Sequence, residues 1–279
     1  MQRIDPLVAE WPLHGPARTR AIERAAQAEL PAHALMRRAG LAVARLALAL
    51  APHAPRFTVY AGPGNNGGDG VEAALQLQGA GKAVRVQFLG DAARLPGDAI
   101  DSHRRAQAAG VPIAAGLAPD APPGEPVIDA LLGLGSSRAP EGEIAGAIDA
   151  IDPARGVVLA VDLPSGLDPR TGQRLGDHAV RATHTLALLA LEPGLFTGAG
   201  RDHAGEVWLD TLGVDASLQA PDAVLAGGPG LWRDDPRQHV QHKGSFGDVH
   251  IVGGAAGMVG AVLLAARAAH AAGAGRVYV

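Results

Sequence analysis

The chain has 279 residues, of which 47% are hydrophobic and only 3% aromatic, and its formal net charge is −4. That much aliphatic material can build a large α/β core, and the slightly acidic balance offers no basic face to nucleic acid. The absence of cysteine excludes disulfides, thiolate metal sites and cysteine nucleophiles, and it suits a cytoplasmic enzyme.

The two most apolar stretches, residues 41–51 and 258–272, fall short of the roughly 20 residues that span a bilayer, and each contains an arginine. We therefore predict a buried helix at each place and no membrane segment. The first thirty residues carry four acidic side chains and no uninterrupted apolar run, so we expect no secretory signal.

Residues 1–16 contain three prolines and are expected to form a loose lead-in. Two helices should follow, one over residues 16–30 with a cap near Thr19 and one over residues 31–51. In the second, Leu35, Met36, Ala39 and Val43 recur at helical spacing.

A glycine-rich stretch, Gly62-Pro63-Gly64-Asn65-Asn66-Gly67-Gly68-Asp69-Gly70, follows a strand predicted at residues 57–61 and precedes a helix predicted at residues 71–78. A strand, a glycine-rich loop and a helix in this order favour phosphate binding, because the backbone comes close to the ligand and the helix dipole attracts an anion. The two asparagines and the aspartate add side-chain oxygens that phosphate binding does not need. The loop is therefore expected to hold a cation or a polar ring as well.

Further strands are predicted at residues 83–89, 111–114, 127–133, 157–162, 185–191 and 206–212, and further helices at residues 99–109 and 144–151. Their alternation predicts a three-layer αβα, Rossmann-like domain over residues 1–215, with a mainly parallel sheet. Residues 216–241 are rich in Pro, Gly and Asp and are expected to be a linker. A strand, an alanine-rich helix and another strand within residues 242–279 are predicted to begin a second α/β domain, the rest of which we expect to be missing.

Polar side chains follow three predicted strands of the first domain: Asn65–Asp69, Asp129, and Asp162 with Ser165. Singly, each could be a helix cap or a turn residue. Ligands in open α/β sheets bind outside the carboxyl ends of the strands, so the coincidence of these side chains at one edge predicts a site.

The residue types narrow the chemistry of that site. Asn66, Asp129 and Ser165 are hard oxygen donors with little summed charge, which suits an alkali or alkaline-earth cation better than zinc. With Asp129 committed to a cation, Asp162 is the better acid–base candidate, because burial between apolar strands would raise its pKa. No Gly-x-Ser-x-Gly elbow and no P-loop motif occur, which argues against a serine hydrolase and a P-loop NTPase.

Together these motifs resemble the N-terminal domain family of NAD(P)H-hydrate epimerases, the first half of bifunctional nicotinamide-nucleotide repair enzymes. The matching stretches are residues 35–40, 62–70, 127–135, 161–168 and 193–195, and the resemblance covers roughly residues 17–215. Residues 242–279 look like the opening of the ADP- or ATP-dependent NAD(P)H-hydrate dehydratase domain, a ribokinase-like fold. They lack that domain's glycine-rich catalytic loop, so no dehydratase activity is expected from this chain.

By this resemblance the protein would be an isomerase that interconverts the R and S epimers of hydrated NADH or NADPH. Asp162 would perform acid–base chemistry at C6 of the hydrated ring, and Asn66, Asp129 and Ser165 would hold a potassium ion. The implied substrate contacts are Asn65, Asn66, Gly67, Gly68, Asp69, Gly133, Leu134, Gly135, Ser136, Ser137, Arg138, Ala139 and Asp162. We also expect a homo-oligomer of two or more subunits.

Two positions depart from the family's pattern and put an ion pair or a ligand contact in doubt. Arg37 stands where an acid is usual, and Glu192 stands where a lysine is usual. Two alternatives stay open. A nucleotide-dependent oxidoreductase could use Asp91, after the second strand, to bind a ribose. A non-catalytic dinucleotide-binding protein could have kept the site without turnover.

Overall fold

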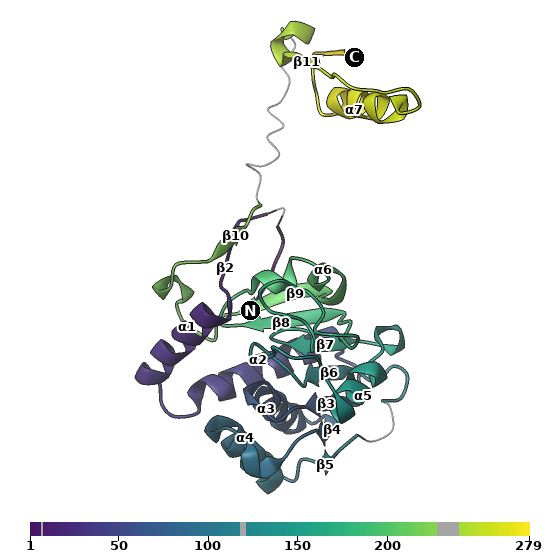
Figure 1. The fold of residues 1–279 in the computed structure, drawn as a ribbon. Helices are drawn as coiled ribbons and strands as arrows, with labels where there is room; N and C mark the ends of the chain where they lie inside the picture. Colours follow the sequence, from purple (N-terminus) through teal and green to yellow (C-terminus); the bar gives the residue numbers. More distant parts are fainter. Residues whose placement is uncertain (7, 118–120, 228–239) are drawn as a thin grey trace. The chain divides into compact units, whose positions relative to one another are not determined.

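The computed structural model describes residues 1–6, 8–117, 121–227 and 240–279. The chain divides into two compact units, Met1–Pro229 and Gly230–Val279, each described by itself below. In the first unit, helices lie on both faces of a central sheet (Figure 1).

The central sheet has eight strands, and all neighbouring strands are parallel except β1 and β9. In spatial order they are β1 (Gln2–Arg3), β9 (Glu206–Asp210), β8 (His184–Leu188), β7 (Val158–Val161), β6 (Val127–Ala130), β3 (Arg56–Ala61), β4 (Ala83–Phe88) and β5 (Ile113–Ala115). The chain builds outward from β3 to β5, then returns to β6 on the other side of β3. The strand order therefore reverses between β3 and β6, where open sheets leave a crevice at their carboxyl edge.

The helices α2 (Ala34–Leu50), α3 (Asn65–Gly79) and α4 (Gly97–Ala108) cover one face of the sheet, and α5 (Gly142–Ala150) covers the other (Figure 1). Successive residues of a strand point to opposite faces, and β3 shows the consequence. Phe57 and Val59 are buried against α2 and α3, whereas Tyr60 is buried in the cluster that contains Ile148 of α5. The predicted three-layer α/β fold with a mainly parallel sheet is confirmed.

The remaining elements of the first unit are short or peripheral. They are α1 (Pro16–Glu29), α6 (Gly200–His203), β2 (Trp11–Leu13), β10 (Ala223–Leu225) and the 3₁₀ helices at Ala92–Arg94, Pro153–Arg155, Pro193–Leu195 and Ala216–Leu218.

The amino-terminal lead-in is more ordered than the three prolines indicated. Strand β1 adds an edge to the sheet beside β9, and β2 pairs antiparallel with β10. Ile4 and Leu13 are buried in the same cluster as Leu191. The expectation of a loose lead-in was wrong, because backbone pairing and apolar side chains fix this segment to the sheet.

The predicted linker at residues 216–241 also needs correction. Its first part forms a 3₁₀ helix and β10, and Asp222 accepts hydrogen bonds from the backbone of Gly15 (2.8 Å) and from Arg18 (2.6 Å). These contacts tie residues 216–225 to the first unit. Residues 228–239 of the predicted linker lie outside the described residues.

The glycine-rich stretch forms the first turns of α3, which begins at Asn65 and not near residue 71 as predicted. Close packing explains this. A Cβ on Gly67 would lie 1.9 Å from the carbonyl oxygen of Gly62, and one on Gly68 would lie 2.8 Å from Ala99 Cβ and from Met36 Sδ. Glycine there lets the helix start directly against the strand and its neighbouring helices.

Ion pairs join α2, α3 and α4. Arg105 pairs with the fully buried Glu72 and with Asp101, and Arg37 also pairs with Asp101. Although partial burial opposes it, hydrogen bonds from Arg105, Arg37 and Arg104 lower the pKa of Asp101 to about 2. The unusual Arg37 thus has a structural partner on α4.

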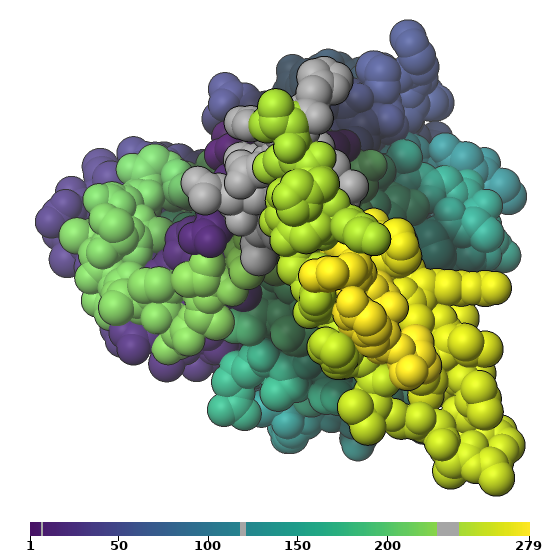
Figure 2. All heavy atoms as spheres, turned by 90° about the horizontal axis from the view of Figure 1, so that it is seen from above, coloured from purple at the N-terminus to yellow at the C-terminus, as the bar shows by residue number. Residues whose placement is uncertain are grey.

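The second unit has a 3₁₀ helix (Lys243–Phe246) and a strand–helix–strand segment: β11 (Asp248–His250), α7 (Val259–Ala271) and β12 (Arg276–Tyr278), with the two strands parallel. The predicted order of these elements is correct. The predicted burial of the helix is not, because within α7 only Val262 is buried, while Leu263 and Leu264 are 54% and 65% exposed (this unit is the yellow-green to yellow part of Figure 2). In the part of the chain that the structure describes, no helix combines the length and apolar character that a membrane crossing needs.

We expect Gly67→Ala to lower the free energy of unfolding by about 1–3 kcal/mol, because the added methyl group overlaps backbone that cannot move aside. Gly79→Ala, at the other end of the same helix, is the matched control, since a Cβ there meets nothing within 4 Å. That variant should be neutral or stabilising by up to about 1 kcal/mol. Urea unfolding measures both, and equal stability of the two variants would contradict the packing role of Gly67.

Candidate active site

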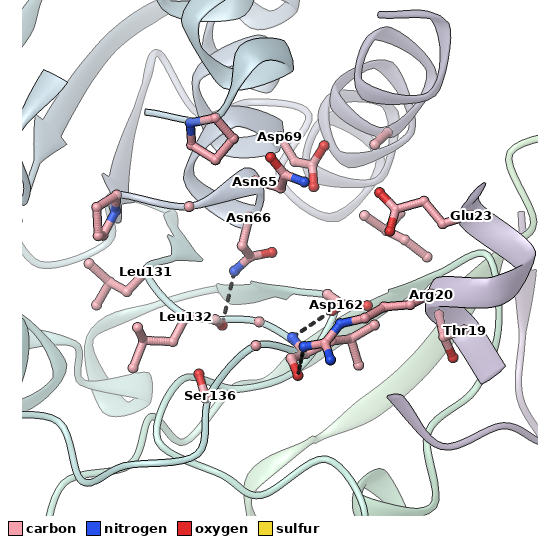
Figure 3. A pocket seen from close by; sticks show the side chains of 18 of the residues that line it. Thr19, Arg20, Glu23, Asn65, Asn66, Asp69, Leu131, Leu132, Ser136 and Asp162 are labelled. Carbon is pink, nitrogen blue, oxygen red and sulfur yellow. Dashed lines mark hydrogen bonds between the residues drawn. The ribbon is translucent and has the colours of Figure 1, made fainter. Parts of the chain in front are cut away.

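A cavity of about 760 Å³ opens at the carboxyl ends of β3, β6 and β7, at the point where the strand order reverses. Its walls come from α1, the start of α3 and the segment 131–141 after β6. Figure 3 shows side chains from these elements around one hollow, with Glu23 of α1 across from Asn65 and Asp69 of α3.

Most of the residues predicted to contact a substrate line this cavity. They are Asn65, Asn66, Asp69, Gly133, Leu134, Gly135, Ser136, Ser137, Arg138, Ala139 and Asp162. Gly67 and Gly68, also predicted, are buried in the helix packing described above and are not among the lining residues. Asp129 and Ser165 are buried as well, at 0% and 1% exposure, and do not line the cavity either.

A buried hydrogen-bond cluster joins the ends of β6 and β7. Asp129 accepts hydrogen bonds from the backbone N–H of Ser165 (2.9 Å), the Ser165 hydroxyl (2.7 Å) and the N–H of Leu131 (3.2 Å). The Ser165 hydroxyl in turn accepts from the N–H of Leu132 (2.9 Å). Asn66 donates from its Nδ2 to the carbonyl of Leu132 (3.0 Å; Figure 3). Leu132 therefore bonds both Asn66 and Ser165, and Ser165 in turn bonds Asp129, which links all three predicted cation ligands.

Within this cluster, the Oδ1 atom of Asn66 is buried without a hydrogen-bond partner. Burial raises the pKa of Asp129 to about 6, although its hydrogen bonds from Ser165 and Leu131 favour the charged form. One carboxylate, one hydroxyl, one amide oxygen and one backbone carbonyl form a donor set that fits a weakly charged hard cation. In the described ranges no three His, Cys, Asp or Glu side chains gather as they would around a zinc-type ion.

Asp162 occupies a strained position at the end of β7. Its φ angle is 69°, in the left-handed region, which costs a non-glycine residue on the order of 1 kcal/mol. The side chain is 7% exposed, and Oδ2 accepts a hydrogen bond from the N–H of Leu134 at 3.3 Å. Burial raises the pKa of Asp162 to about 7, so this carboxyl can gain or lose a proton near neutral pH.

Gly133 lies between Asn66 and Asp162, and its lack of a side chain leaves room for both. A Cβ at this position would lie 3.2 Å from Asp162 Oδ2 and 3.2 Å from both Cβ and Cγ of Asn66. Asp162, directly after β7, and Asn66, in α3, therefore both lie close to Gly133.

Further carboxyl groups line the cavity beside Asp162. Burial, followed by the charge of Asp162 and then that of Glu23, raises the pKa of Asp69 well above its usual range. Burial and the charge of Asp98 raise the pKa of Glu23. Positive charge comes from Arg20, which donates to the carbonyl of Leu134 (3.2 Å), and from Arg138.

The sequence analysis did not identify one wall of the cavity. The wall is the face of α1 that carries Thr19, Arg20, Glu23 and Gln27. These polar residues recur at helical spacing, a signal that could have marked this face. Glu192 was identified only as a departure from the family's pattern, and the structure shows that this acid, which follows β8, is fully buried.

The two departures from the family's pattern have different surroundings. Arg37 pairs with Asp101 and is not among the cavity residues. Glu192 accepts a hydrogen bond from the hydroxyl of Thr19 (3.2 Å), and its Oε2 atom has no partner.

The chain matches a known protein family over the residues that form most of this site. Residues 32–194 match the family described as YjeF-related protein N-terminus. The chain belongs to this family. The resemblance recognised in the sequence is thereby confirmed, although α1, with the cavity residues Thr19, Arg20 and Glu23, lies outside the part that matches the YjeF-related family.

Two curated relatives and one solved structure define the likeness further. The NAD(P)H-hydrate epimerase of Bordetella pertussis strain Tohama I is 41% identical over 204 residues, which are 72% of this chain and 88% of that protein. The bifunctional NAD(P)H-hydrate repair enzyme Nnr of Coxiella burnetii is 37% identical over 265 residues, which are 93% of this chain and 54% of that protein. The chain thus spans about half the length of the bifunctional relatives it matches.

The crystal structure of the yeast protein ynu0 has the same fold. It superposes with a TM-score of 0.57 and 19% identity, over 65% of this chain and 82% of the yeast chain.

We expect Asp162→Asn to stabilise the protein at high pH. Because the folded-state pKa of Asp162, about 7, lies above the ordinary 3.8, its contribution to stability is full below pH 4 and is lost as the pH rises through 7. Asparagine stays neutral and tolerates the left-handed φ. The variant should therefore melt at a higher temperature than the parent at pH 8, with a gap that shrinks toward pH 4. Thermal melts across this range measure the gap, Asp177→Asn on the surface is the control, and a gap independent of pH would contradict the raised pKa.

Proposed function

We propose that the first unit is an NAD(P)H-hydrate epimerase, an isomerase that interconverts the R and S epimers of hydrated NADH and NADPH. The observation that carries the proposal is Asp162, a buried carboxyl with a pKa of about 7 in the cavity at the reversal of strand order. The 41% identity to a relative named NAD(P)H-hydrate epimerase, over 88% of that relative, supports it.

The substrate of this reaction carries a hydroxyl on C6, next to the ring nitrogen. In the proposed mechanism, protonated Asp162 gives its proton to that hydroxyl, the C6–O bond breaks, and water leaves as the nitrogen lone pair forms an iminium. Water then adds to either face of C6 and returns one proton to the Asp162 carboxylate. Atoms and electrons balance without an oxidant, and a pKa near neutral pH lets one group serve as both acid and base.

The two ends of the cavity suit different parts of a dinucleotide. The backbone of residues 133–139 presents N–H groups and the side chain of Arg138 adds positive charge, both of which favour the diphosphate. The carboxyls of Glu23, Asp69 and Asp98 repel phosphate and suit hydroxyl and amide donors. We therefore propose that the diphosphate lies along residues 133–139, with the ribose and carboxamide toward the carboxyls.

We also propose that Asn66, Asp129 and Ser165 hold a potassium ion together with the carbonyl of Leu132. The unpartnered Oδ1 of Asn66 and the fully buried carboxyl of Asp129 support this. A bound cation would supply positive charge that favours ionised Asp129. The residues themselves fix the ends of β6 and β7 through the hydrogen bonds between Asp129 and Ser165.

A nucleotide-dependent oxidoreductase is less well supported. Asp91, the residue that it would need for the ribose, caps a 3₁₀ helix by accepting a hydrogen bond from Ala93 N–H and does not line the cavity.

For the second unit we propose a correspondence to the opening of the dehydratase half of the bifunctional relatives. The match to the Coxiella enzyme covers 93% of 279 residues, about 259, whereas the first unit has 229, so the match extends into residues 240–279.

We expect Asp162→Asn to lower the rate of epimerisation by about 10²–10⁴-fold, the usual contribution of general acid–base catalysis. The measurement starts from the purified R epimer of hydrated NADH and follows the S epimer by chromatography. Asp149→Asn, an exposed substitution of the same kind, is the control. An unchanged rate in Asp162→Asn would overturn the assignment, and no turnover by the parent would favour a non-catalytic binding protein.

We expect replacement of potassium by tetramethylammonium to lower the rate, because the larger ion cannot enter a site of closely spaced oxygens. Asn66→Ala should weaken potassium binding on the order of tenfold through the loss of one ligand. Thallium binding, detected by anomalous scattering, checks the site directly, with Ser217→Ala as a surface control. Full activity and no bound thallium would contradict the cation proposal.

A further inference from the structure

Three carboxyl side chains in the described part of the first unit have no exposed surface: Glu72, Asp129 and Glu192. Two of them, Glu72 and Asp129, have several hydrogen-bond or ion-pair partners. Glu72 has an ion pair with Arg105 and hydrogen bonds from Ser102 and Gln76. Asp129 accepts the three hydrogen bonds described above.

Glu192 has fewer polar partners than either Glu72 or Asp129. Its Oε1 accepts from the Thr19 hydroxyl at 3.2 Å, and its own backbone N–H also donates to the carboxyl. Its Oε2 is buried without a partner. A buried carboxylate is stable only when its lone pairs are satisfied or a cation pairs with it, and Glu192 has neither.

The charges around Glu192 also disfavour ionisation. Asp162, at the end of the neighbouring strand, is the charged group that acts on it. The backbone N–H of the buried His14 donates to the carbonyl of Leu191 (2.8 Å), the residue before Glu192. The ring Nε2 of His14 bonds to the carbonyl of Gln219 (3.1 Å), and its Nδ1 has no hydrogen-bond partner among the described residues. The described residues supply no positive partner for Glu192.

We propose that Glu192 is a neutral carboxylic acid that positions the hydroxyl of Thr19 and keeps a second negative charge away from Asp162. In this state the 3.2 Å contact runs in the opposite direction: the acid O–H of Glu192 donates to Thr19 Oγ1. The Thr19 hydroxyl is then free to donate to the carbonyls of His14 or Gly15, both at 3.4 Å, or to a ligand, because Thr19 lines the cavity. Burial, followed by the charge of Asp162, holds the pKa of Glu192 well above its usual range, which agrees with this state.

The neutral state has a consequence for Asp162. A negative charge on Glu192 would make Asp162 hold its proton to higher pH, and a positive charge there would make it release the proton at lower pH. Glu192 is thus a positioning residue. It orients the Thr19 hydroxyl, and because it is neutral it adds no negative charge beside Asp162. The part of this inference that concerns turnover rests on the proposed epimerase function.

The first test is independent of activity and compares the melting temperatures of the parent and Glu192→Gln from pH 5 to pH 9. Glutamine mimics the neutral acid in shape and charge. Because the folded pKa of Glu192 lies above the ordinary 4.5, the parent should lose stability relative to the variant as the pH rises above that value. The advantage of the variant should therefore grow with pH.

Glu72→Gln is the matched control for this test and should lower the melting temperature, because it removes a partner of Arg105. A parent that is as stable as Glu192→Gln at pH 9, or more stable, would overturn the proposal, since Glu192 would then be ionised and compensated.

The second test measures the pH dependence of epimerisation. Glu192→Gln should leave the midpoint within about 0.3 pH units, because it exchanges one neutral group for another, whereas Glu192→Lys should lower the midpoint by about one unit. A lowered midpoint in Glu192→Gln would show that a negative charge had been removed and would overturn the proposal. If the parent shows no epimerisation, the proposed function fails, and the melting comparison still decides the state of Glu192.

Discussion

The hydrogen bonds between Asp129 and Ser165 hold the site together. Asp129 lies next to the last residue of β6, and Ser165 lies in the turn after β7, so the two hydrogen bonds from Ser165 to the buried Asp129 carboxyl join two neighbouring strand ends. The backbone of Leu132, which bonds both Ser165 and Asn66, is fixed with them. The segment 131–141, which forms one wall of the cavity, is therefore held in place by a buried polar cluster. Leaving a member of this cluster unpaired would cost free energy.

The free-energy cost of burying a carboxylate raises the pKa values of the acids in and beside the cavity. Low solvent access raises the pKa of Asp162, Asp69 and Glu192, although their surroundings differ. Desolvation makes Asp162 suitable for proton transfer near neutral pH. At the same pH it makes Asp162 destabilising, because the ionised carboxylate is buried. The ion pair between Glu72 and Arg105 shows that the fold can neutralise a buried acid where no proton transfer is needed.

One wall of the cavity has a separate origin in the chain. Helix α1 lies outside the residues that match the YjeF-related family, yet Thr19, Arg20 and Glu23 face the cavity. Its start is held by Asp222, just before β10. The matched region thus supplies Asp162 and the cluster of Asn66, Asp129 and Ser165, and a helix whose start is held by the distant Asp222 forms another wall of the cavity.

The layered α/β fold, the parallel sheet and the polar residues Asn66, Asp129, Asp162 and Ser165 after the strands could be predicted from the sequence. Hydrophobic periodicity and glycine-rich turns are local signals, and strand ends in such sheets meet at one edge. Only the folded chain shows that β1 and β2 pair with distant strands, that Gly67 and Gly68 serve packing, that α1 lines the cavity, and that Glu192 is fully buried beside Thr19. These features depend on contacts between residues far apart in the sequence, and on how much solvent each polar group keeps, which no local pattern encodes.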